Sequence, residues 1–245
     1  ADPATGQAML ATAENVARDG AMTRAALDEL TLLRWQQYQH ALANDRRVQR
    51  RYLQPIVIER GRKTLRVEAD EGVHPYSAEG LAALKPVQAG GVVTHGAQTH
   101  PADGCAGALL CSRERAATLA RGAGTVRLLA AGFARAGKAL MPKAATTAAQ
   151  RALESAGVAI GDVKIVVTHN PFAVNDLWFA QQTGFPLERM NPYGCSLIYG
   201  HPQGPTGLRG IAELAHALHD AGGGVGVFTG CAAGDTGAAL VLRVD

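Results

Sequence analysis

The second half of the chain alternates short apolar runs with amphipathic helical patterns, and this alternation constrains the fold more than any other feature. Strands are predicted in the apolar runs 126–134, 163–168, 225–229 and 238–244. Helices are predicted between them at 146–156, 172–183 and 208–218. Apolar residues that recur every three or four positions indicate the helices, and short β-branched runs indicate the strands. Strands that alternate with helices are typical of a layered α/β domain.

The first half of the chain is less regular. Helical spacing predicts helices at 8–19, 23–43 and 112–121, and a short one at 78–84. Two short strands are predicted at 54–59 and 64–68, and the rest of 70–103 is rich in loop-forming residues. The small apolar run GCAGALLC, residues 104–111, is predicted to be a buried strand.

Composition excludes several classes of protein. The chain has 245 residues, of which 47% are hydrophobic and 18% charged, as in a globular protein with a sizeable core. No apolar run approaches the roughly 20 residues that span a bilayer. The net charge of +3 is too small to indicate a nucleic-acid partner. The four cysteines form no CxxC pair, so no metal site is predicted, and we interpret the thiols as reduced in a cytoplasmic compartment.

Basic residues nevertheless cluster between residues 46 and 66. They are Arg46, Arg47, Arg50, Arg51, Arg60, Arg62, Lys63 and Arg66. One interpretation is a solvated surface, which is the usual role of a charge run. The other is a docking surface for a phosphorylated ligand.

Three short segments each place a reactive side chain in a loop at the end of a predicted strand or before a helix. They are HNPF (169–172), GHPQG (200–204) and CAAGDTG (231–237). Reactive groups collect in loops held by a rigid scaffold. Taken singly, each segment is a weak signal, because a lone cysteine between strands is usually a small buried hydrophobe. Their combination, in this order, predicts a functional site.

The order and flanks of these segments resemble the thiolase family. NPYGCSLIYGHPQGPTG (191–207) resembles the family's Asn followed by GHPxGxxG, CAAGDTG (231–237) its Cys-centred glycine loop, and HNPF (169–172) its NEAF or HxxF segment. Further stretches resemble the family's loop domain and the segment that follows it, at 8–17, 23–41, 69–87 and 92–110. The resemblance covers essentially the whole chain and is specific for the family, not for one member.

The resemblance implies a five-layered α/β/α/β/α thiolase fold. This chain would supply the loop domain (1–95), a return strand and helix that complete the N-terminal half (96–122), and the C-terminal domain (123–245). No residue matches the family's nucleophilic cysteine, which lies upstream of these segments. We therefore expect the N-terminal half to be absent and to come from a separate or cleaved chain. Strand 104–111 would then have an open edge, so an isolated monomer is expected to be unstable. The family's dimers and tetramers imply a homo-oligomer.

The activity implied by the resemblance is CoA-dependent acyl transfer, either thiolytic cleavage of a 3-oxoacyl-CoA or the reverse Claisen condensation. Coenzyme A enters as a substrate, and no covalently bound cofactor is implied. His201 would be the base for the nucleophilic thiol, and Cys231 would carry the proton at the α-carbon. His169, with His201 or an ordered water, would stabilise the enolate oxygen. The backbone N–H of Ala233 would serve a second oxyanion hole.

Four further residues match positions that contact CoA or line the acyl path. They are Arg60, Thr99, Met141 and Phe172. The alternative for each is an exposed arginine or an ordinary core residue. Ala233 replaces a family glycine, which raises the question of whether the loop needs a positive φ there.

Two other functions are compatible with the resemblance. One is a non-catalytic thiolase-like subunit that binds CoA esters or a partner protein, and the other is a thiolase-like aldolase acting on acyl-CoA. Retention of His201 and Cys231 favours the catalytic thiolase over both. HNPF in place of NEAF favours the degradative branch of the family.

Overall fold

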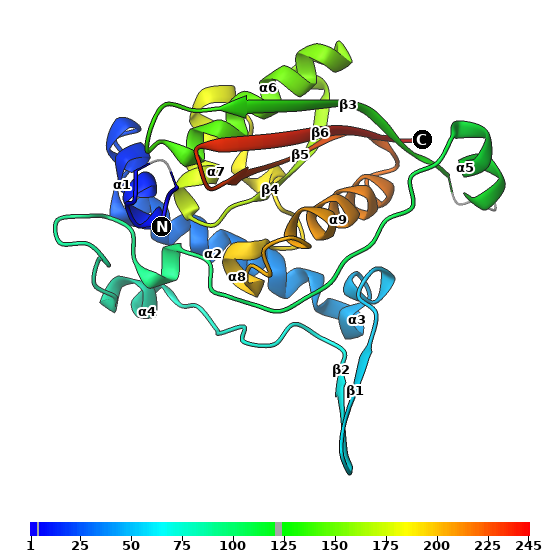
Figure 1. The fold of residues 1–245 in the computed structure, drawn as a ribbon, viewed down its shortest axis with the longest axis horizontal. Coiled ribbons are helices and arrows are strands. Elements are labelled where there is room, and N and C mark those ends of the chain that lie inside the picture. The colour runs from blue at the N-terminus through cyan, green and yellow to red at the C-terminus, as the bar shows by residue number, and fades with distance from the viewer. Residues whose placement is uncertain (4, 121–123) are drawn as a thin grey trace.

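The computed structural model describes residues 1–3, 5–120 and 124–245, and a mixed sheet forms the centre of the second half (Figure 1). Its strand order is β3-β6-β5-β4. The strands are β3 (Val126–Arg135), β4 (Val163–His169), β5 (Gly224–Ala232) and β6 (Thr236–Val244). β4 and β5 run parallel, whereas β3–β6 and β5–β6 are antiparallel pairs. The four strands predicted in this half are confirmed, with ends that differ by at most three residues.

Helices cover both faces of this sheet. They are α6 (Met141–Ala156), α7 (Ala173–Thr183) and α9 (Thr206–Asp220). The short helix α8 (Ser196–Tyr199) precedes α9 and packs against the first half of the chain. α6 packs against β3, β5 and β6, and α9 packs against β4 and β5. Alternate strand residues enter two different apolar clusters, so the Val166, Val227 and Val241 side meets α6 and the opposite side meets α9.

α6 approaches the sheet closely because the side chains on both contacting surfaces are small. The helix presents a row of buried alanines, at positions 144, 145, 148, 149 and 152. A Cβ added at Gly132 would lie 2.3 Å from the Ala148 carbonyl oxygen, and one at Gly237 would lie 2.4 Å from that of Ala144. The helix ends at Gly157, which adopts the left-handed conformation typical of a helix C-terminus.

The first half contains helices and one isolated hairpin. The helices are α1 (Met9–Asp19), α2 (Arg24–Ala41), α3 (Ala43–Arg46), α4 (Ala78–Ala83) and α5 (Arg113–Ala120). The hairpin joins β1 (Ile56–Arg60) to β2 (Lys63–Val67) and projects away from the rest of the chain (Figure 1). Thr23 caps α2, because its side chain accepts a hydrogen bond from the Ala26 N–H. These elements confirm the predicted helices and the pair of strands, and residue 121 lies outside the described part.

The two halves share one core. Ala13 and Val16 of α1 and Leu27 and Leu30 of α2 belong to the same buried cluster as Cys231 at the end of β5. The helices of the first half therefore support the end of the central sheet.

The predicted strand at 104–111 is wrong. These residues form no regular structure, and Leu109 and Leu110 are 78% and 82% exposed. A strand needs a neighbour for its backbone N–H and C=O groups, and no described segment pairs with this one.

In the described part of the chain, no helix is both long enough and apolar enough to cross a membrane.

Candidate active site

The three predicted reactive segments meet at the carboxyl ends of β4 and β5. His169 is the last residue of β4, and Cys231 lies next to the end of β5. Because these strands are parallel and His169 pairs with Gly230, their carboxyl ends lie side by side. The GHP segment joins them, since the rings of His169 and His201 stack with centroids 4.2 Å apart. His169, His201 and Cys231 are thus brought to one place.

His169 is a buried, neutral imidazole. Burial lowers its pKa to about 3, and the neighbouring His201 adds to the effect. Its Nδ1 lies 2.9 Å from the Ser196 hydroxyl oxygen. A ring held this way is uncharged at neutral pH, with one nitrogen committed to Ser196.

His201 is half-buried and lies in the loop that precedes α9. Its Nδ1 lies 2.7 Å from the Thr206 hydroxyl, and its backbone N–H donates to the His100 carbonyl at 2.8 Å. Burial lowers its pKa, so the ring keeps a lone pair for accepting a proton. The preceding Gly200 has φ 91°, and a Cβ there would lie 2.8 Å from that of Ala102. Only glycine allows the chain to bring His201 into this position.

Cys231 is a buried thiol with one polar neighbour. The side-chain amide of Asn175 donates to its Sγ at 3.3 Å. Burial raises the pKa of this thiol to about 12, and the Asn175 hydrogen bond acts in the opposite direction. At neutral pH the group holds its proton, as a proton donor must. Sequence reasoning missed Asn175, whose only signal was its position in the helix directly after HNPF.

Ala233 lies in the turn between β5 and β6. The left-handed positions of this turn are Gly234 and Asp235, with φ of 84° and 58°, and Ala233 is not among them. Alanine in place of the family glycine therefore requires no unfavourable backbone conformation. The Asp235 carboxylate fixes the turn by accepting hydrogen bonds from the N–H groups of Ala139 and Leu140.

Three of the predicted CoA-contacting residues lie beside this site. The Thr99 hydroxyl donates to the Ser196 carbonyl at 2.5 Å, and its N–H donates to the Pro171 carbonyl at 2.8 Å. Met141 and Phe172 are buried in the same apolar cluster as Cys231. These contacts put Thr99, Met141 and Phe172 next to the reactive side chains.

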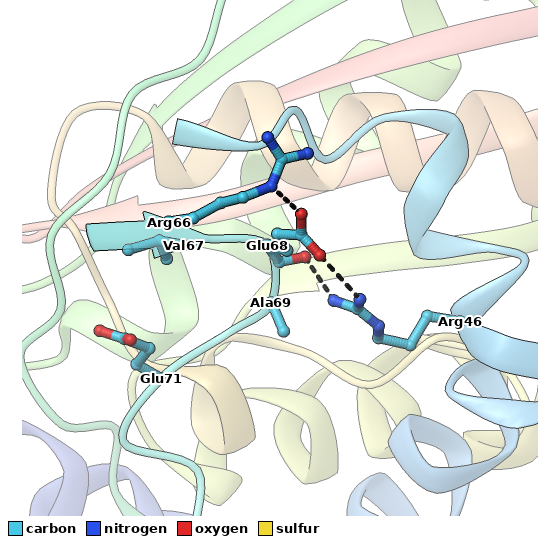
Figure 2. A pocket seen from close by; sticks show the side chains of 6 residues that line it. All are labelled: Arg46, Arg66, Val67, Glu68, Ala69 and Glu71. Carbon is cyan, nitrogen blue, oxygen red and sulfur yellow. Dashed lines mark hydrogen bonds and ion pairs between the residues drawn. The ribbon is translucent and has the colours of Figure 1, made fainter. Parts of the chain in front are cut away.

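Arg60 is not brought to the site. It is exposed at the end of β1, in the projecting hairpin (Figure 1). At the base of that hairpin, Arg46 and Arg66 line an open pocket and both pair with Glu68 (Figure 2). Glu68 therefore offsets part of the charge of the basic cluster. The side chain of Arg60 has no hydrogen-bond or ion-pair partner among the described residues.

A buried polar network lies behind His169. Asp176 in the first turn of α7 forms an ion pair with Arg34 of α2 at 2.9 Å, and both side chains are fully buried. Asn170 and Ser196 connect this pair to His169. Sequence reasoning missed these residues, because nothing in their spacing indicates that α2 crosses α7 here. No group of histidine, cysteine and acidic side chains in the described residues is arranged to hold a metal ion.

Comparisons with known proteins agree with this geometry. Residues 1–114 match the family model "Thiolase, N-terminal domain" and residues 123–244 match "Thiolase, C-terminal domain". Acetyl-CoA acetyltransferase of Escherichia coli is 32% identical over 234 residues, which are 95% of this chain and 59% of that protein. The rat protein "3-ketoacyl-CoA thiolase B, peroxisomal" is 33% identical over 242 residues, 95% of this chain and 56% of the relative.

Solved structures give the same result. An acetyl-CoA acetyltransferase of Bacillus anthracis superposes with a TM-score of 0.92 and 28% identity, covering 100% of this chain and 62% of that one. Human mitochondrial 3-ketoacyl-CoA thiolase superposes with a TM-score of 0.88 and 26% identity, covering 97% of this chain and 60% of that one. The chain spans somewhat more than half the length of the curated relatives that it matches.

The match over residues 1–114 corrects one prediction. The absence of a residue matching the family's nucleophilic cysteine predicts that the N-terminal half is missing, and this prediction is wrong. Residues 1–114 belong to the N-terminal domain instead, and their helices α1 and α2 pack into the core beside Cys231. With both domain types matched in order and the fold shared along the whole chain, the protein belongs to the thiolase family and has its α/β fold.

Proposed function

We propose that the protein is a CoA-dependent acyltransferase that cleaves 3-oxoacyl-CoA with CoA, or runs the reverse Claisen condensation. One observation supports the proposal above all: His169, His201 and Cys231 come together at the carboxyl ends of β4 and β5. The matched relatives bear the names acetyl-CoA acetyltransferase and 3-ketoacyl-CoA thiolase. Coenzyme A is a substrate in this reaction, and no covalently bound cofactor takes part.

The proposed proton transfers follow from the protonation states of the side chains. His201 takes the proton of the thiol that accepts the acyl group. As the bond between C2 and C3 of the substrate breaks, its electron pair passes to C2, which takes the proton of Cys231. CoA then attacks the acyl thioester and returns a proton to Cys231, and the departing thiolate recovers its proton from His201. A neutral imidazole and a protonated thiol are the starting states that this sequence requires.

The remaining site residues have supporting roles in the proposal. His169, with His201 or a water molecule, stabilises the enolate oxygen, and the N–H of Ala233 serves a second oxyanion hole. Thr99, Met141 and Phe172 line the path of the substrate, because they lie beside Cys231 and Ser196. Arg60 contacts the distal, phosphorylated part of CoA from the hairpin, where its side chain is exposed and unpaired among the described residues.

Thiolysis of acetoacetyl-CoA and longer 3-oxoacyl-CoAs by the full-length protein tests the proposal. Replacing Cys231 by Ala should lower kcat/KM by about 100-fold or more, the usual contribution of a positioned acid or base. Cys111→Ala is the matched control, because Cys111 is exposed. Mass spectrometry after incubation with acetyl-CoA identifies the cysteine that holds the acyl group.

Two outcomes would count against the proposal. Unchanged thiolysis in Cys231→Ala would refute the assigned proton carrier. A wild-type protein that binds acyl-CoA in calorimetry without cleaving or condensing it would be a CoA-ester-binding subunit instead.

We further propose the division into residues 1–95, 96–122 and 123–245, homo-oligomeric assembly and a cytoplasmic location. Assembly is supported by exposed apolar side chains on β3 and on the segment before α5, such as Phe133 at 69%. The cytoplasmic location is supported by the four cysteines, which are all free. Sedimentation of the full-length protein tests the assembly, and the expected result is a species larger than a monomer.

A further inference from the structure

The buried network behind His169 starts from one carboxylate. Asp176 is fully buried, and both of its oxygens accept hydrogen bonds from neighbouring side chains. The donors are Arg34 Nε at 2.9 Å, Thr168 Oγ1 at 2.6 Å, Asn170 Nδ2 at 2.8 Å and Asn191 Nδ2 at 2.9 Å. An ionised carboxylate accepts hydrogen bonds and donates none. The network therefore has a fixed direction at its origin.

The acceptor role of Asp176 fixes the orientation of the Asn170 side-chain amide. Because Asp176 only accepts, the amide group of Asn170 that faces it must be the NH₂ group. The carbonyl oxygen of the same amide is thereby turned towards Ser196, whose Oγ lies 3.3 Å away. A carbonyl oxygen has no hydrogen to give, so the Ser196 hydroxyl donates to Asn170.

The Ser196 hydroxyl in turn fixes which role His169 Nδ1 takes in their hydrogen bond. A serine hydroxyl has a single hydrogen, and Asn170 receives it. The contact of 2.9 Å between Ser196 Oγ and His169 Nδ1 then requires the hydrogen to sit on Nδ1. The His169 ring is neutral because burial lowers its pKa to about 3, so it carries only that one N–H. Its Nε2 is left as a lone pair.

We infer that Asp176, acting through Asn170 and Ser196, holds His169 in the tautomer with its proton on Nδ1 and its Nε2 as a hydrogen-bond acceptor. Asp176, Asn170 and Ser196 are positioning residues in this account. The buried Arg34 forms an ion pair with Asp176, and Thr168 and Asn191 fix its two oxygens. A buried hydrogen-bond partner that sets the tautomer of a ring sets what the ring can do.

The consequence for the reaction rests on the proposed function. A lone pair on Nε2 cannot donate to an enolate oxygen. A water molecule must stand between them, giving one hydrogen to Nε2 and the other to the oxygen. This decides between the two ways in which His169 was proposed to act, in favour of the water.

Nitrogen NMR of the full-length protein, with ¹⁵N-labelled histidine and no substrate, measures the tautomer directly. The expected spectrum shows His169 Nδ1 as the nitrogen with a bound proton and Nε2 with the shift of an unprotonated nitrogen. A proton on Nε2 in the wild-type protein would overturn the inference. The measurement needs no turnover, so a protein without thiolysis activity gives the same answer about the ring.

Two variants test the route by which the tautomer is set. Asn170→Leu removes the acceptor for the Ser196 hydroxyl, which then donates to Nδ1 and moves the ring proton to Nε2. Gln181→Leu is the control, because it also replaces a side-chain amide by leucine but at an exposed position of α7 away from the network. This variant should leave the tautomer unchanged. An Asn170→Leu protein that keeps its circular dichroism spectrum and its proton on Nδ1 would refute the relay. If that variant does not fold, the wild-type spectrum still decides the matter.

Discussion

At the scale of single residues, burial sets the protonation states of the candidate site. Loss of solvent disfavours the charged form of any side chain. It lowers the pKa of His169 to about 3 and raises that of Cys231 to about 12. The imidazole is thereby kept neutral and the thiol protonated. Burial therefore accounts for both protonation states, and no charged neighbour of Cys231 is needed to keep its proton.

The low pKa of His169 makes stability depend on pH. In the unfolded chain this histidine binds a proton below about pH 6.5, whereas in the folded chain it stays neutral down to about pH 3. Between these limits the unfolded state holds more protons, so stability falls as pH falls. From pH 7 to pH 5 the loss from His169 should be about 2 kcal/mol, since each pH unit is worth roughly 1.4 kcal/mol.

Urea unfolding at the two pH values, for the wild type and His169→Asn, checks this expectation. The variant lacks the titrating ring, so its unfolding free energy should fall by about 2 kcal/mol less than that of the wild type. Equal losses in both proteins would show that His169 titrates normally in the folded state.

At the scale of elements, contact between α6 and the sheet depends on two glycines. Gly132 in β3 and Gly237 in β6 lie directly under the alanine row of the helix, with backbone atoms of Ala144 and Ala148 in the space of a Cβ. Side chains larger than alanine on the helix, or than glycine on the strands, would separate the two layers. The close approach also fixes the start of β6, which follows the Cys231 turn.

Gly237→Ala should therefore destabilise the protein. The new Cβ would lie 2.4 Å from the Ala144 carbonyl group, so α6 must move, at a cost of roughly 1–3 kcal/mol. Gly161→Ala is the matched control, since a Cβ there meets no atom within 4 Å. Denaturant midpoints measure both, and equal midpoints for the two variants would contradict the close packing.

Which elements could be predicted from the sequence follows from the range of the interactions. Hydrophobic periodicity and glycine stops are local, so α9 and the strands of the second half were predicted within three residues of their observed bounds. α6 ends where predicted, at Gly157, but begins five residues before its predicted start. The strand expected at 104–111 failed, because a strand depends on a pairing partner that no local pattern specifies.

The site was predictable to a similar extent. Motifs identified His169, His201 and Cys231, which the fold brings together. Asn175, Asp176 and Ser196 were not predictable, because their roles depend on which group each one faces across the core. The CoA role of Arg60 stays a prediction, as its hairpin projects away from the rest of the chain (Figure 1).

At the scale of the whole molecule, the first half is part of the support of the site. α2 supplies Arg34 to the Asp176 carboxylate, and Arg34 also donates to the carbonyl groups of Leu187 and Met190. α1 and α2 contribute apolar side chains to the cluster that contains Cys231. The residues of the two matched domains thus form one interior.

Breaking the ion pair between the halves should cost far more than breaking a surface pair. Arg34→Met leaves the Asp176 carboxylate buried without its partner, which typically costs about 3–5 kcal/mol. Arg50→Met is the control, because Arg50 and Asp45 are 58% and 72% exposed, and pairs of that kind contribute about 1 kcal/mol or less. Urea unfolding gives both values, and a loss at Arg34 no larger than at Arg50 would contradict a structural link through this pair.

The role proposed for Cys231, beside His169 and His201, is to move a proton at the α-carbon of an acyl-CoA. Exchange of the C2 hydrogens of acetyl-CoA with deuterium oxide, followed by mass spectrometry in the full-length protein, measures that transfer without requiring a complete reaction cycle. Wild-type protein should introduce deuterium at C2, and Cys231→Ala should do so about 100-fold more slowly or worse. Exchange at the same rate in the wild type and Cys231→Ala, or none in the wild type, would contradict the account.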